Sequence, residues 1–279
     1  MRKLSLTWDT LGRDDPFWAV LSEEERREGR WNPKDFYATG PVEVAQLKER
    51  LARYGLSLKG ERALDFGCGV GRISQALGTH FDRVDGVDIS APMLDQARRF
   101  NTQGHTCQFT QNHSPNLKLF EDETFDFVYS RIVLQHMPAS LARCYIAEFY
   151  RVLRPGGILF FQIPAGWNLS SPETFQELRH HVTVPRGLYK AIRRLVMFDW
   201  LRPQERKDPR LSAEFEMHFT PVSRVMRLLE RFDLQVAEIK RDNACGEKMC
   251  SYNYLVTKPA NPPARLHSRW AWRRITSPD

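Results

Sequence analysis

The feature that most constrains the fold is the segment 63–74, ALDFGCGVGRIS, in which three glycines follow directly on an apolar run. Gly67, Gly69 and Gly71 alternate with other residues, so the backbone can adopt positive φ at several nearby positions. Glycine also lets a ligand approach the backbone without a Cβ in the way. Because ligands of open parallel sheets bind where the first strand turns into its helix, the segment predicts such a turn with room for a ligand.

Around this segment, short apolar runs alternate with helical patterns. The runs are apolar on both faces, which is typical of strands in a parallel sheet covered on both sides. The predicted strands are RALDF, RVDGVDI, CQFT, FDFVYS, GILFFQI, LQVAEIK and SYNYLVTK. The predicted helices are DPFWAVLSEEERREGR, GPVEVAQLKERLARYG, RISQALGTHF, APMLDQARRF, SLARCYIAEFYRVLRPGG and TPVSRVMRLLERF. This alternation predicts an α/β protein with a Rossmann-like, doubly wound and mostly parallel sheet.

Three of the predicted helices carry signals for their ends. Asp15 is the expected N-cap of the first helix, with Pro16 at its first position. Thr220 is expected to cap the last helix and Pro221 to open it. The Pro-Gly-Gly segment 155–157 is expected to end the helix before the fifth strand.

The composition is that of a soluble globular protein, with 42% hydrophobic and 27% charged residues in a chain of 279. The N-terminal segment has no long apolar stretch after its basic start, and no run approaches the roughly 18 apolar residues of a membrane span. We therefore expect a cytoplasmic enzyme. The net charge of +7 favours anionic partners but does not choose among nucleotides, phosphorylated sugars, RNA and lipid headgroups.

The five cysteines include no CxxC pair, and we expect reduced thiols. Cys245 and Cys250 could be metal ligands, but no second pair or nearby histidine run completes a tetrahedral set. No metal site is expected.

The spacing of the glycines distinguishes between two kinds of cofactor loop. Counted from Gly67, the nicotinamide fingerprint G-x-G-x-x-G requires a glycine at position 72, where this chain has Arg72. The chain instead reads D-x-G-x-G-x-G from Asp65. Asp88 closes the next predicted strand, at about the spacing expected of a carboxylate that accepts from two ribose hydroxyls.

With these residues the chain resembles the class I S-adenosylmethionine-dependent methyltransferases of the methyltransferase type 11 kind. The resemblance rests on LDFGCGVGR, GVDIS, FDFVYSRIVLQHM and LRPGGILFF; it is strong over 60–164 and weaker over 218–258. It implies a seven-stranded sheet with a reversed last strand. We expect an N-terminal helical lid or substrate segment (1–59), a methyltransferase domain (60–258) with a specificity insert (164–217), and a flexible basic tail (259–279).

The resemblance also implies which residues hold S-adenosyl-L-methionine. Asp88 would hold the ribose and Ile89 would lie against the adenine, while Asn112 stands where the family often has an aspartate. The segment RWNPKDFYATG, which contains Tyr37, could close over the cofactor as a lid; alternatively its aromatic residues belong to the core. The expected cofactor-binding residues are Asp65, Gly67, Cys68, Gly69, Gly71, Arg72, Asp88, Ile89, Asn112, Ser130 and Tyr37.

The implied reaction is an in-line displacement, in which an oxygen, nitrogen or carbon attacks the methyl carbon and a neutral thioether leaves. The leaving group is already activated, so the protein mainly positions the reactants and excludes water. His136 is the candidate general base, because a histidine titrates in the right range; alternatively it packs under the following helix. Arg131 is expected at the end of the fourth strand, beside the transferring methyl group.

The acceptor is less constrained by the sequence. The segment 186–202 is basic and amphipathic, so it either contacts an anionic membrane or phosphorylated substrate, or packs its apolar face on the sheet. The segment 261–264, NPPA, lies in the tail and ends in alanine, which argues against amino-methylation of adenine or glutamine. We expect transfer to oxygen or nitrogen of a small-molecule or glycan acceptor, with an anionic one favoured by the charge.

Two alternative functions stay open. One is an RNA methyltransferase, which the positive charge and the tail segment RLHSRWAWRR suggest, although no recognisable RNA-binding module accompanies them. The other is a protein that binds S-adenosylmethionine without turnover.

Overall fold

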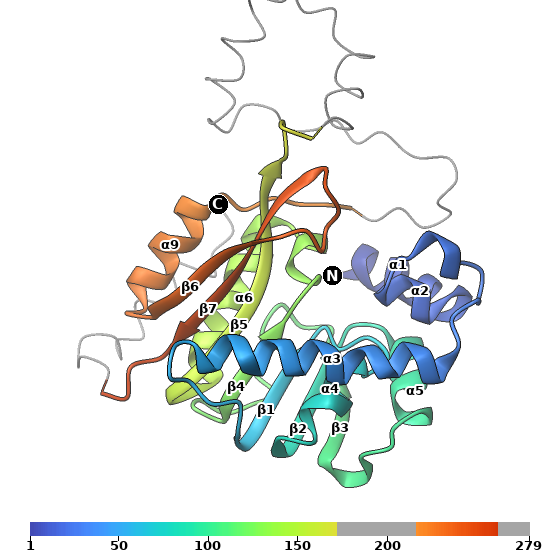
Figure 1. Ribbon diagram of the computed structural model, residues 1–279, viewed down its shortest axis with the longest axis horizontal. Coiled ribbons are helices and arrows are strands. Elements are labelled where there is room, and N and C mark those ends of the chain that lie inside the picture. Colours follow the sequence, from blue (N-terminus) through green and yellow to red (C-terminus); the bar gives the residue numbers. More distant parts are fainter. Residues whose placement is uncertain (172–215, 262–279) are drawn as a thin grey trace, which may run out of the picture.

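The protein is described by a computed structural model that covers residues 1–171 and 216–261 (Figure 1). The basic segment 186–202, most of the insert 164–217 and most of the tail 259–279 lie outside the described residues. The strands are β1 (Gly60–Phe66), β2 (Phe81–Asp88), β3 (Cys107–Gln111), β4 (Phe125–Ser130), β5 (Leu153–Trp167), β6 (Gln235–Asp242) and β7 (Met249–Thr257). The helices are α1 (Arg2–Asp14), α2 (Pro16–Val20), α3 (Pro33–Ala52), α4 (Arg72–Leu77), α5 (Ala91–Arg99), α6 (Ala139–Val152) and α9 (Val222–Arg231). Short 3₁₀ turns are η1 (Glu24–Arg26), η2 (Gly104–Thr106) and η3 (Leu134–His136).

The seven strands form one sheet in the order β3-β2-β1-β4-β5-β7-β6. All neighbours from β3 to β5 pair in parallel, whereas β7 is antiparallel to both β5 and β6. The predicted fold class is therefore confirmed, including the reversed last strand. The chain leaves β1 toward β2 on one side and later returns to β4 on the other, which creates the switch point where doubly wound sheets bind ligands.

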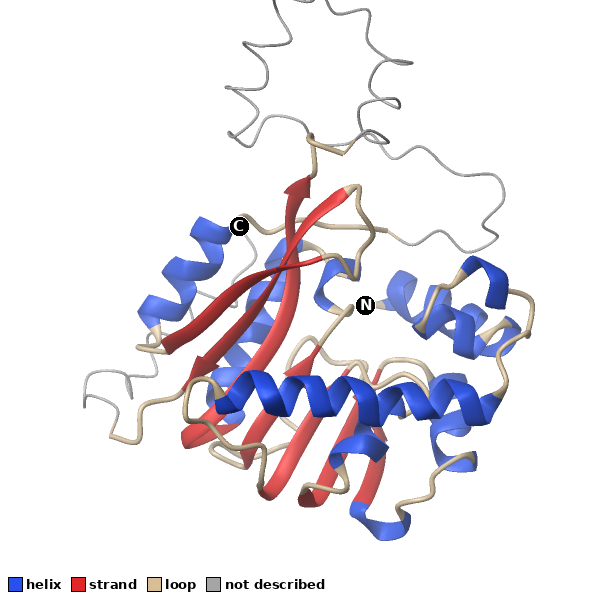
Figure 2. Ribbon diagram, in the orientation of Figure 1, coloured by secondary structure: helices blue, strands red, loops and turns tan. Residues whose placement is uncertain are grey.

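Helices cover both faces of the sheet (Figure 2). On one face α3, α4 and α5 pack on the strands, and Leu47, Leu77 and Leu94 belong to a single buried cluster. On the other face α6 and α9 form a second cluster that contains Phe149 and Val225. The sheet is thus buried on both sides, which explains the strands' continuous apolar runs.

A third, smaller core holds the N-terminal helices against the glycine loop. Trp31 and Phe36 are buried in it together with Val70 of the loop and Met93 of α5. In this arrangement the aromatic residues of the segment 30–40 are core residues.

Helix α3 begins at Pro33, with Asn32 as its N-cap, seven residues before the predicted start at Gly40. Three further local predictions were wrong, each for a physical reason. The predicted helix at 15–30 is confined to α2, because the polar run after it has no apolar stripe to bury; Asp15 does cap it, accepting from Trp18 N. Helix α6 ends at Val152, before the segment 155–157, because Leu153 already pairs with Phe125 of β4.

The third correction concerns the start of α9, which the sequence places one residue early. Pro221 occupies the N-cap position and Val222 is the first helical residue. Thr220 does not cap the helix with its side chain; its backbone N donates to Pro164 O at 2.9 Å. Helix α1 was not predicted at all. No helix in the described ranges is long and apolar enough to cross a membrane.

Lys258, directly after β7, ties the end of the sheet to the end of α6. Its Nζ donates to Leu153 O at 2.8 Å and Tyr150 O at 3.3 Å, and it lies 3.1 Å from Glu123 Oε1. The residue is only 4% exposed, so these carbonyls have little access to water. A cation at this position also interacts favourably with the C-terminal end of the helix dipole.

We therefore expect Lys258→Met to lower the free energy of unfolding by about 2 kcal/mol, since buried carbonyls lose a charged donor while the apolar stem is kept. Urea denaturation followed by circular dichroism measures the change. Lys118→Met, on an exposed side chain, is the matched control and should change stability by less than about 0.5 kcal/mol. Equal stabilities of the two variants would contradict the assigned role of Lys258.

Candidate active site

The glycine loop forms the predicted turn between β1 and α4. Gly67 and Gly69 have φ of 75° and 54°, in the region that favours glycine. A Cβ on Gly67 would lie 2.3 Å from Val133 Cγ2, and one on Gly69 would lie 2.8 Å from Val20 Cγ2. The glycines are therefore required both by the turn and by the close approach of side chains from two other segments.

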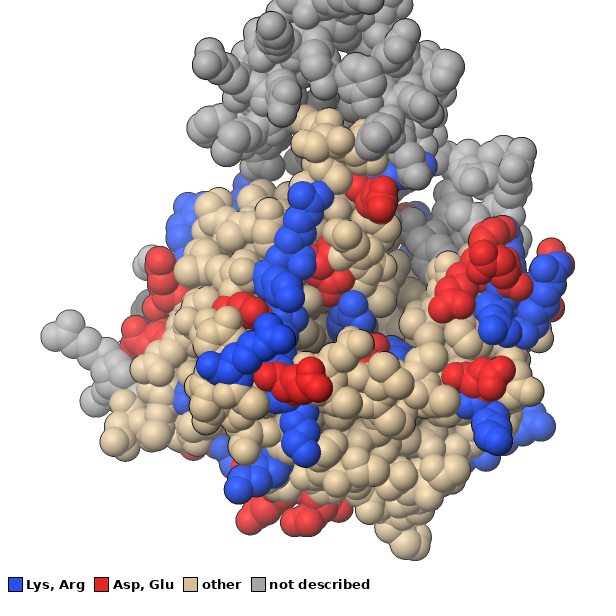
Figure 3. All heavy atoms as spheres, in the orientation of Figure 1, with Lys and Arg blue, Asp and Glu red and all other residues tan. Residues whose placement is uncertain are grey.

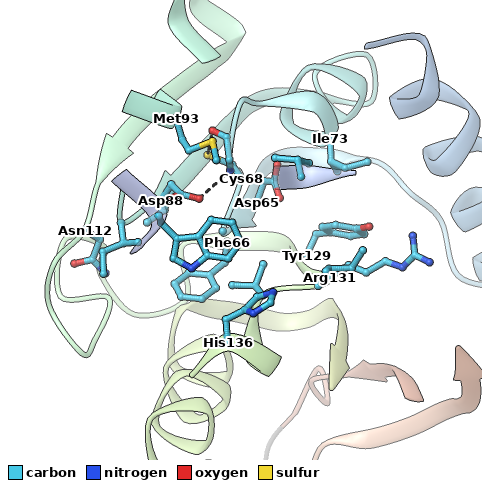
Figure 4. A pocket seen from close by; sticks show the side chains of 18 of the residues that line it. Asp65, Phe66, Cys68, Ile73, Asp88, Met93, Asn112, Tyr129, Arg131 and His136 are labelled. Atoms are coloured by element: carbon cyan, nitrogen blue, oxygen red, sulfur yellow. Dashed lines mark hydrogen bonds between the residues drawn. The ribbon is translucent and has the colours of Figure 1, made fainter. Parts of the chain in front are cut away.

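A pocket lies beside this loop, at the carboxyl ends of β1, β2 and β4. Asp88 and Asn112 lie at one end, Tyr129 and Arg131 at the other, and Asp65 and His136 between them (Figure 4). Predicted site residues that line the pocket are Asp65, Gly67, Cys68, Gly69, Arg72, Asp88, Ile89, Asn112, Arg131 and His136. The sheet topology thus brings together residues that are up to 71 positions apart.

Three predicted site residues lie outside the lining of this pocket. Gly71 is the N-cap of α4, and a Cβ there would meet the Phe109 ring at 2.8 Å. Tyr37 donates from its hydroxyl to Val70 O at 2.8 Å, so it supports the loop from outside. Ser130 is fully buried at the end of β4.

The pocket is covered by the N-terminal segment. Met1, Leu4 and Trp8 line it, and the Trp8 ring meets the His136 ring edge-on at 5.0 Å between centroids. The cavity volume is about 110 Å³, below the roughly 300 Å³ at which small-molecule pockets begin. A nucleoside-sized ligand therefore requires the covering side chains to move outward.

Asp88 is fixed by two backbone donors. Its Oδ2 accepts from Gly69 N at 2.8 Å, and its Oδ1 accepts from Ser90 N at 2.9 Å. Burial raises the pKa of this carboxyl group, and backbone hydrogen bonds from Ser90, Gly69 and Ile89 oppose that shift. A carboxylate has about four acceptor positions, so the group keeps acceptor capacity for a ligand hydroxyl.

Asn112 is already engaged in a local turn. Its Nδ2 donates to Asn116 O at 2.8 Å, and its Oδ1 accepts from Ser114 N at 3.0 Å. The side-chain oxygen keeps one acceptor position, as the predicted contact with an adenine amine requires.

Asp65 is a second buried carboxyl group in the pocket. Its Oδ2 accepts from Ser74 Oγ at 2.6 Å, and the residue is 3% exposed. Burial raises its pKa to about 7, although the Ser74 hydrogen bond acts in the opposite direction. With Asp88, it makes this part of the pocket favourable for a cationic ligand, whose charge would stabilise both carboxylates.

A buried charge cluster closes the opposite end of the pocket. Glu43 lies 2.7 Å from the guanidinium groups of both Arg72 and Arg131, and Arg131 also lies 3.1 Å from Asp242. The Tyr129 hydroxyl donates to Glu43. Burial alone would raise the pKa of Glu43, but the two arginines lower it to about 2.

The backbone after β4 is strained. Ile132 has φ of 61°, which is rare for a β-branched residue, and its N donates to Gln162 Oε1 at 2.9 Å. The strained turn directs Arg131, Ile132 and Val133 to the pocket in succession. Such strain persists where the surroundings hold it in place, and here the fully buried Gln162 side chain does so.

His136 lies in the pocket, but both ring nitrogens have partners. Its Nδ1 is 3.3 Å from Glu216 O, and its Nε2 is 3.2 Å from Gln135 Nε2. A carbonyl can only accept and an amide NH₂ can only donate, so the proton is assigned to Nδ1. Burial lowers the pKa of the ring to about 4, so it is neutral at pH 7.

Several lining residues were missed by the sequence analysis. Glu43 stands on the apolar stripe of α3, three residues after Gly40 and four before Leu47, and a charged residue on such a stripe was the available signal. Leu4, Trp8 and Leu11 form a similar stripe in α1. Val133 carries no signal, because its contact with Gly67 depends on the turn after β4. In the described part of the chain, no group of three or more His, Cys, Asp or Glu residues is placed to hold a metal ion.

Comparisons with known proteins agree with this geometry. Residues 64–161 match the family model described as "Methyltransferase domain". The chain is 36% identical over 124 residues to a malonyl-[acyl-carrier protein] O-methyltransferase from Serratia marcescens, covering 43% of this chain and 45% of that protein. It is 30% identical over 135 residues to a ubiquinone biosynthesis O-methyltransferase from Coxiella burnetii, covering 47% and 55%. The matched region thus spans about half the length of these relatives.

Two solved structures share the fold. One is a magnesium protoporphyrin IX methyltransferase from Synechocystis with bound SAH, with a TM-score of 0.56, 17% identity and coverage of 91% of this chain and 97% of that one. The other is a SAM-dependent methyltransferase from Methanosarcina mazei, with a TM-score of 0.54, 23% identity and coverage of 76% and 98%. The chain thus contains a methyltransferase domain at 64–161, within a seven-stranded sheet that has the fold of the SAM-dependent methyltransferase from Methanosarcina mazei.

Proposed function

We propose that this protein binds S-adenosyl-L-methionine in the pocket beside the glycine loop and transfers its methyl group to an oxygen or nitrogen atom of a small-molecule acceptor. The observation that carries the proposal is the Asp88 carboxylate, which backbone donors hold at the pocket beside the glycine loop and which keeps acceptor capacity. A ribose hydroxyl is a donor that suits it. The names of the two curated relatives, both O-methyltransferases, favour oxygen as the acceptor atom.

The residues of the pocket fit this cofactor in three respects. Asp88 would hold the ribose, Ile89 and Met93 offer an apolar wall for the adenine, and Asp65 offers a carboxylate for the cationic methionine part. When bound, S-adenosyl-L-methionine supplies a methyl group that is already activated for displacement. The chain's own contribution is therefore to orient the reactants and to exclude water, and Trp8 covers the pocket in a way suited to the second task.

His136 would assist an acceptor hydroxyl as a base only after Gln135 releases its Nε2. Its low pKa makes it a weak base, but one that stays unprotonated through the whole neutral range. Arg131 is paired with Glu43 and Asp242, so in this arrangement it shapes the pocket wall. Its partner Glu43 also accepts from the Tyr129 hydroxyl.

The direct test is incubation of the protein with methyl-labelled cofactor and the small-molecule fraction of a cell extract, followed by chromatography of the labelled product. We expect label in one small molecule. A parallel incubation uses the RNA fraction of the same extract: label there instead would favour the alternative of an RNA methyltransferase, and a protein that binds cofactor but labels neither fraction would be a binding protein without turnover.

Asp88→Asn is expected to weaken binding of both S-adenosylmethionine and S-adenosylhomocysteine about 100-fold, because charge-assisted hydrogen bonding to the ribose is lost. Isothermal titration calorimetry measures this change. Asp95→Asn on exposed α5 is the matched control and should bind as the wild type does. No heat with either ligand on well-folded wild-type protein would overturn the proposed function.

Asp65 predicts a pH dependence of cofactor binding. Its pKa of about 7 means that the ligand-free protein holds a proton there at pH 6, and a cationic ligand favours the ionised form. Affinity should therefore rise about fivefold as pH increases from 6 to 7, and level off above pH 8 at about tenfold in all. Asp65→Asn should remove this dependence. A wild-type affinity that does not change with pH over this range would show that Asp65 does not contact the cation.

The same raised pKa has a consequence for stability. The folded state binds a proton at Asp65 more tightly than the unfolded chain, so the stability of the ligand-free protein should fall as pH rises from about 4 to 7. The melting temperature of Asp65→Asn should fall less over this range than that of the wild type.

His136→Gln distinguishes a base from a packing residue. If His136 is the base, turnover of the labelled acceptor should fall by about 100-fold or more, while the dissociation constant of S-adenosylhomocysteine stays unchanged. Because its pKa is about 4, the wild-type rate should not decline between pH 8 and pH 6 through this group. His105→Gln, on an exposed side chain, is the control. Unchanged turnover in His136→Gln would assign the residue to packing.

A further inference from the structure

A second cavity, of about 860 Å³, adjoins the cofactor pocket on the side of the charge cluster. Helix α3, the ends of β4 and β5 and the β6–β7 hairpin form its walls. Glu43, Tyr129 and Arg131 line both this cavity and the cofactor pocket. These three side chains are therefore the wall that the two spaces share.

The second cavity contains buried polar atoms without partners. Asn253 is 6% exposed and Ser171 4%, and neither Asn253 Oδ1 nor Ser171 Oγ has a hydrogen-bond partner among the described residues. Arg50 Nη2 is a third such atom. A buried polar atom left unpaired destabilises a protein by about 1–3 kcal/mol, so three around one cavity indicate a ligand that pairs with them.

The unpaired end of Arg50 is held in a fixed position. Its Nε donates to Glu238, and its guanidinium lies over the Phe160 ring, 5.3 Å from the centroid. The guanidinium is therefore a fixed part of the cavity wall, and its Nη2 is a buried donor without a partner among the described residues. An oxyanion is the ligand group that such a donor prefers.

The rim of the cavity adds positive charge. Arg53, Lys240 and Arg241 are exposed and have no ion-pair partner within 4.0 Å in the described ranges. Lysine and arginine side chains gather over β6 and the β6–β7 hairpin, above α3 (Figure 3). Of the acidic residues that line the cavity, Glu43 and Asp242 are paired with arginines, whereas Glu49 and Glu247 are exposed at the rim among the cations.

We propose that this second cavity is the acceptor site and that the acceptor is an anionic polyol, a small molecule with hydroxyl groups and a phosphate or carboxylate. This inference rests on the proposed function. Arg50, with the cations of the rim, binds the anionic group, and Asn253 Oδ1 and Ser171 Oγ accept from hydroxyls. An acceptor hydroxyl that reaches the shared wall at Tyr129 and Arg131 enters the cofactor pocket.

The transfer step at that wall balances without a further reactant. The acceptor oxygen forms a bond to the methyl carbon while the sulfur–methyl bond breaks and its electron pair stays on sulfur. The hydroxyl proton passes to water or to a base. The products are a methyl ether and a neutral thioether.

The inference is tested by binding, with no need for turnover. Glucose 6-phosphate, glucuronate, glucose and inorganic phosphate are titrated into the full chain saturated with S-adenosylhomocysteine, up to about 10 mM, and followed by calorimetry and saturation-transfer NMR. We expect one of the two anionic sugars to bind at least tenfold more tightly than glucose and phosphate. The stronger of the two identifies the anion as phosphate or carboxylate.

Variants then locate the site. Asn253→Ala and Arg50→Met should each weaken binding of the anionic sugar about tenfold and leave the dissociation constant of S-adenosylhomocysteine unchanged, whereas Lys118→Met should change neither. Arg50→Met leaves Glu238 without its ion-pair partner and could therefore prevent folding. Ser171→Ala breaks no ion pair and tests the same site in that case. If S-adenosylhomocysteine binds but neither anionic sugar does, or if the variants bind the sugar as the wild type does, water alone fills the cavity and this inference is wrong. Failure of S-adenosylhomocysteine to bind would instead overturn the proposed function.

Discussion

The structure of the site depends on one carboxylate. Asp88, at the end of β2, accepts from Gly69 N of the neighbouring β1–α4 loop and from Ser90 N at the start of α5. These two hydrogen bonds join the two segments that flank the switch point of the sheet. The N-terminal segment is attached at the same place, because Ser90 Oγ donates to Trp8 O at 3.1 Å. A single half-buried carboxylate therefore positions the glycine loop, the following helix and, through its neighbour, the cover of the pocket.

The second organising feature is the charge cluster around Glu43. Its arginine partners come from α4 and from the turn after β4, and Arg131 extends the connection to Asp242 at the end of β6. A protein is strongly destabilised when one member of a buried ion pair is lost. These ion pairs therefore keep the elements in their relative positions. The wall between the two cavities is thus held by three ion pairs that join α3, α4, the turn after β4 and β6.

The elements of the sheet could be predicted because each strand is a local apolar run, and Asp65 and Asp88 could be predicted because the loop pattern fixes their spacing. Features that depend on contacts between residues distant in the sequence could not be predicted. Glu43 meets Arg131 across 88 positions, and no local pattern specifies that pairing. The apolar stripe of α1 and the charged Glu43 on the apolar stripe of α3 are signals present in the sequence. The positive φ of Ile132, in contrast, is held by a hydrogen bond to the Gln162 side chain on another strand. The low pKa of His136 likewise results from its burial, which depends on the tertiary structure and not on the local sequence.

The narrowness of the pocket under Trp8 links cofactor exchange to the dynamics of the first helix. If the ligand enters only while that helix is displaced, the apparent dissociation constant equals the intrinsic one divided by the fraction of open molecules. The residence time of the bound ligand would then depend on how often α1 moves away from the pocket. Because Ser90 Oγ holds Trp8 O, a few contacts far from the reacting atoms would set that rate.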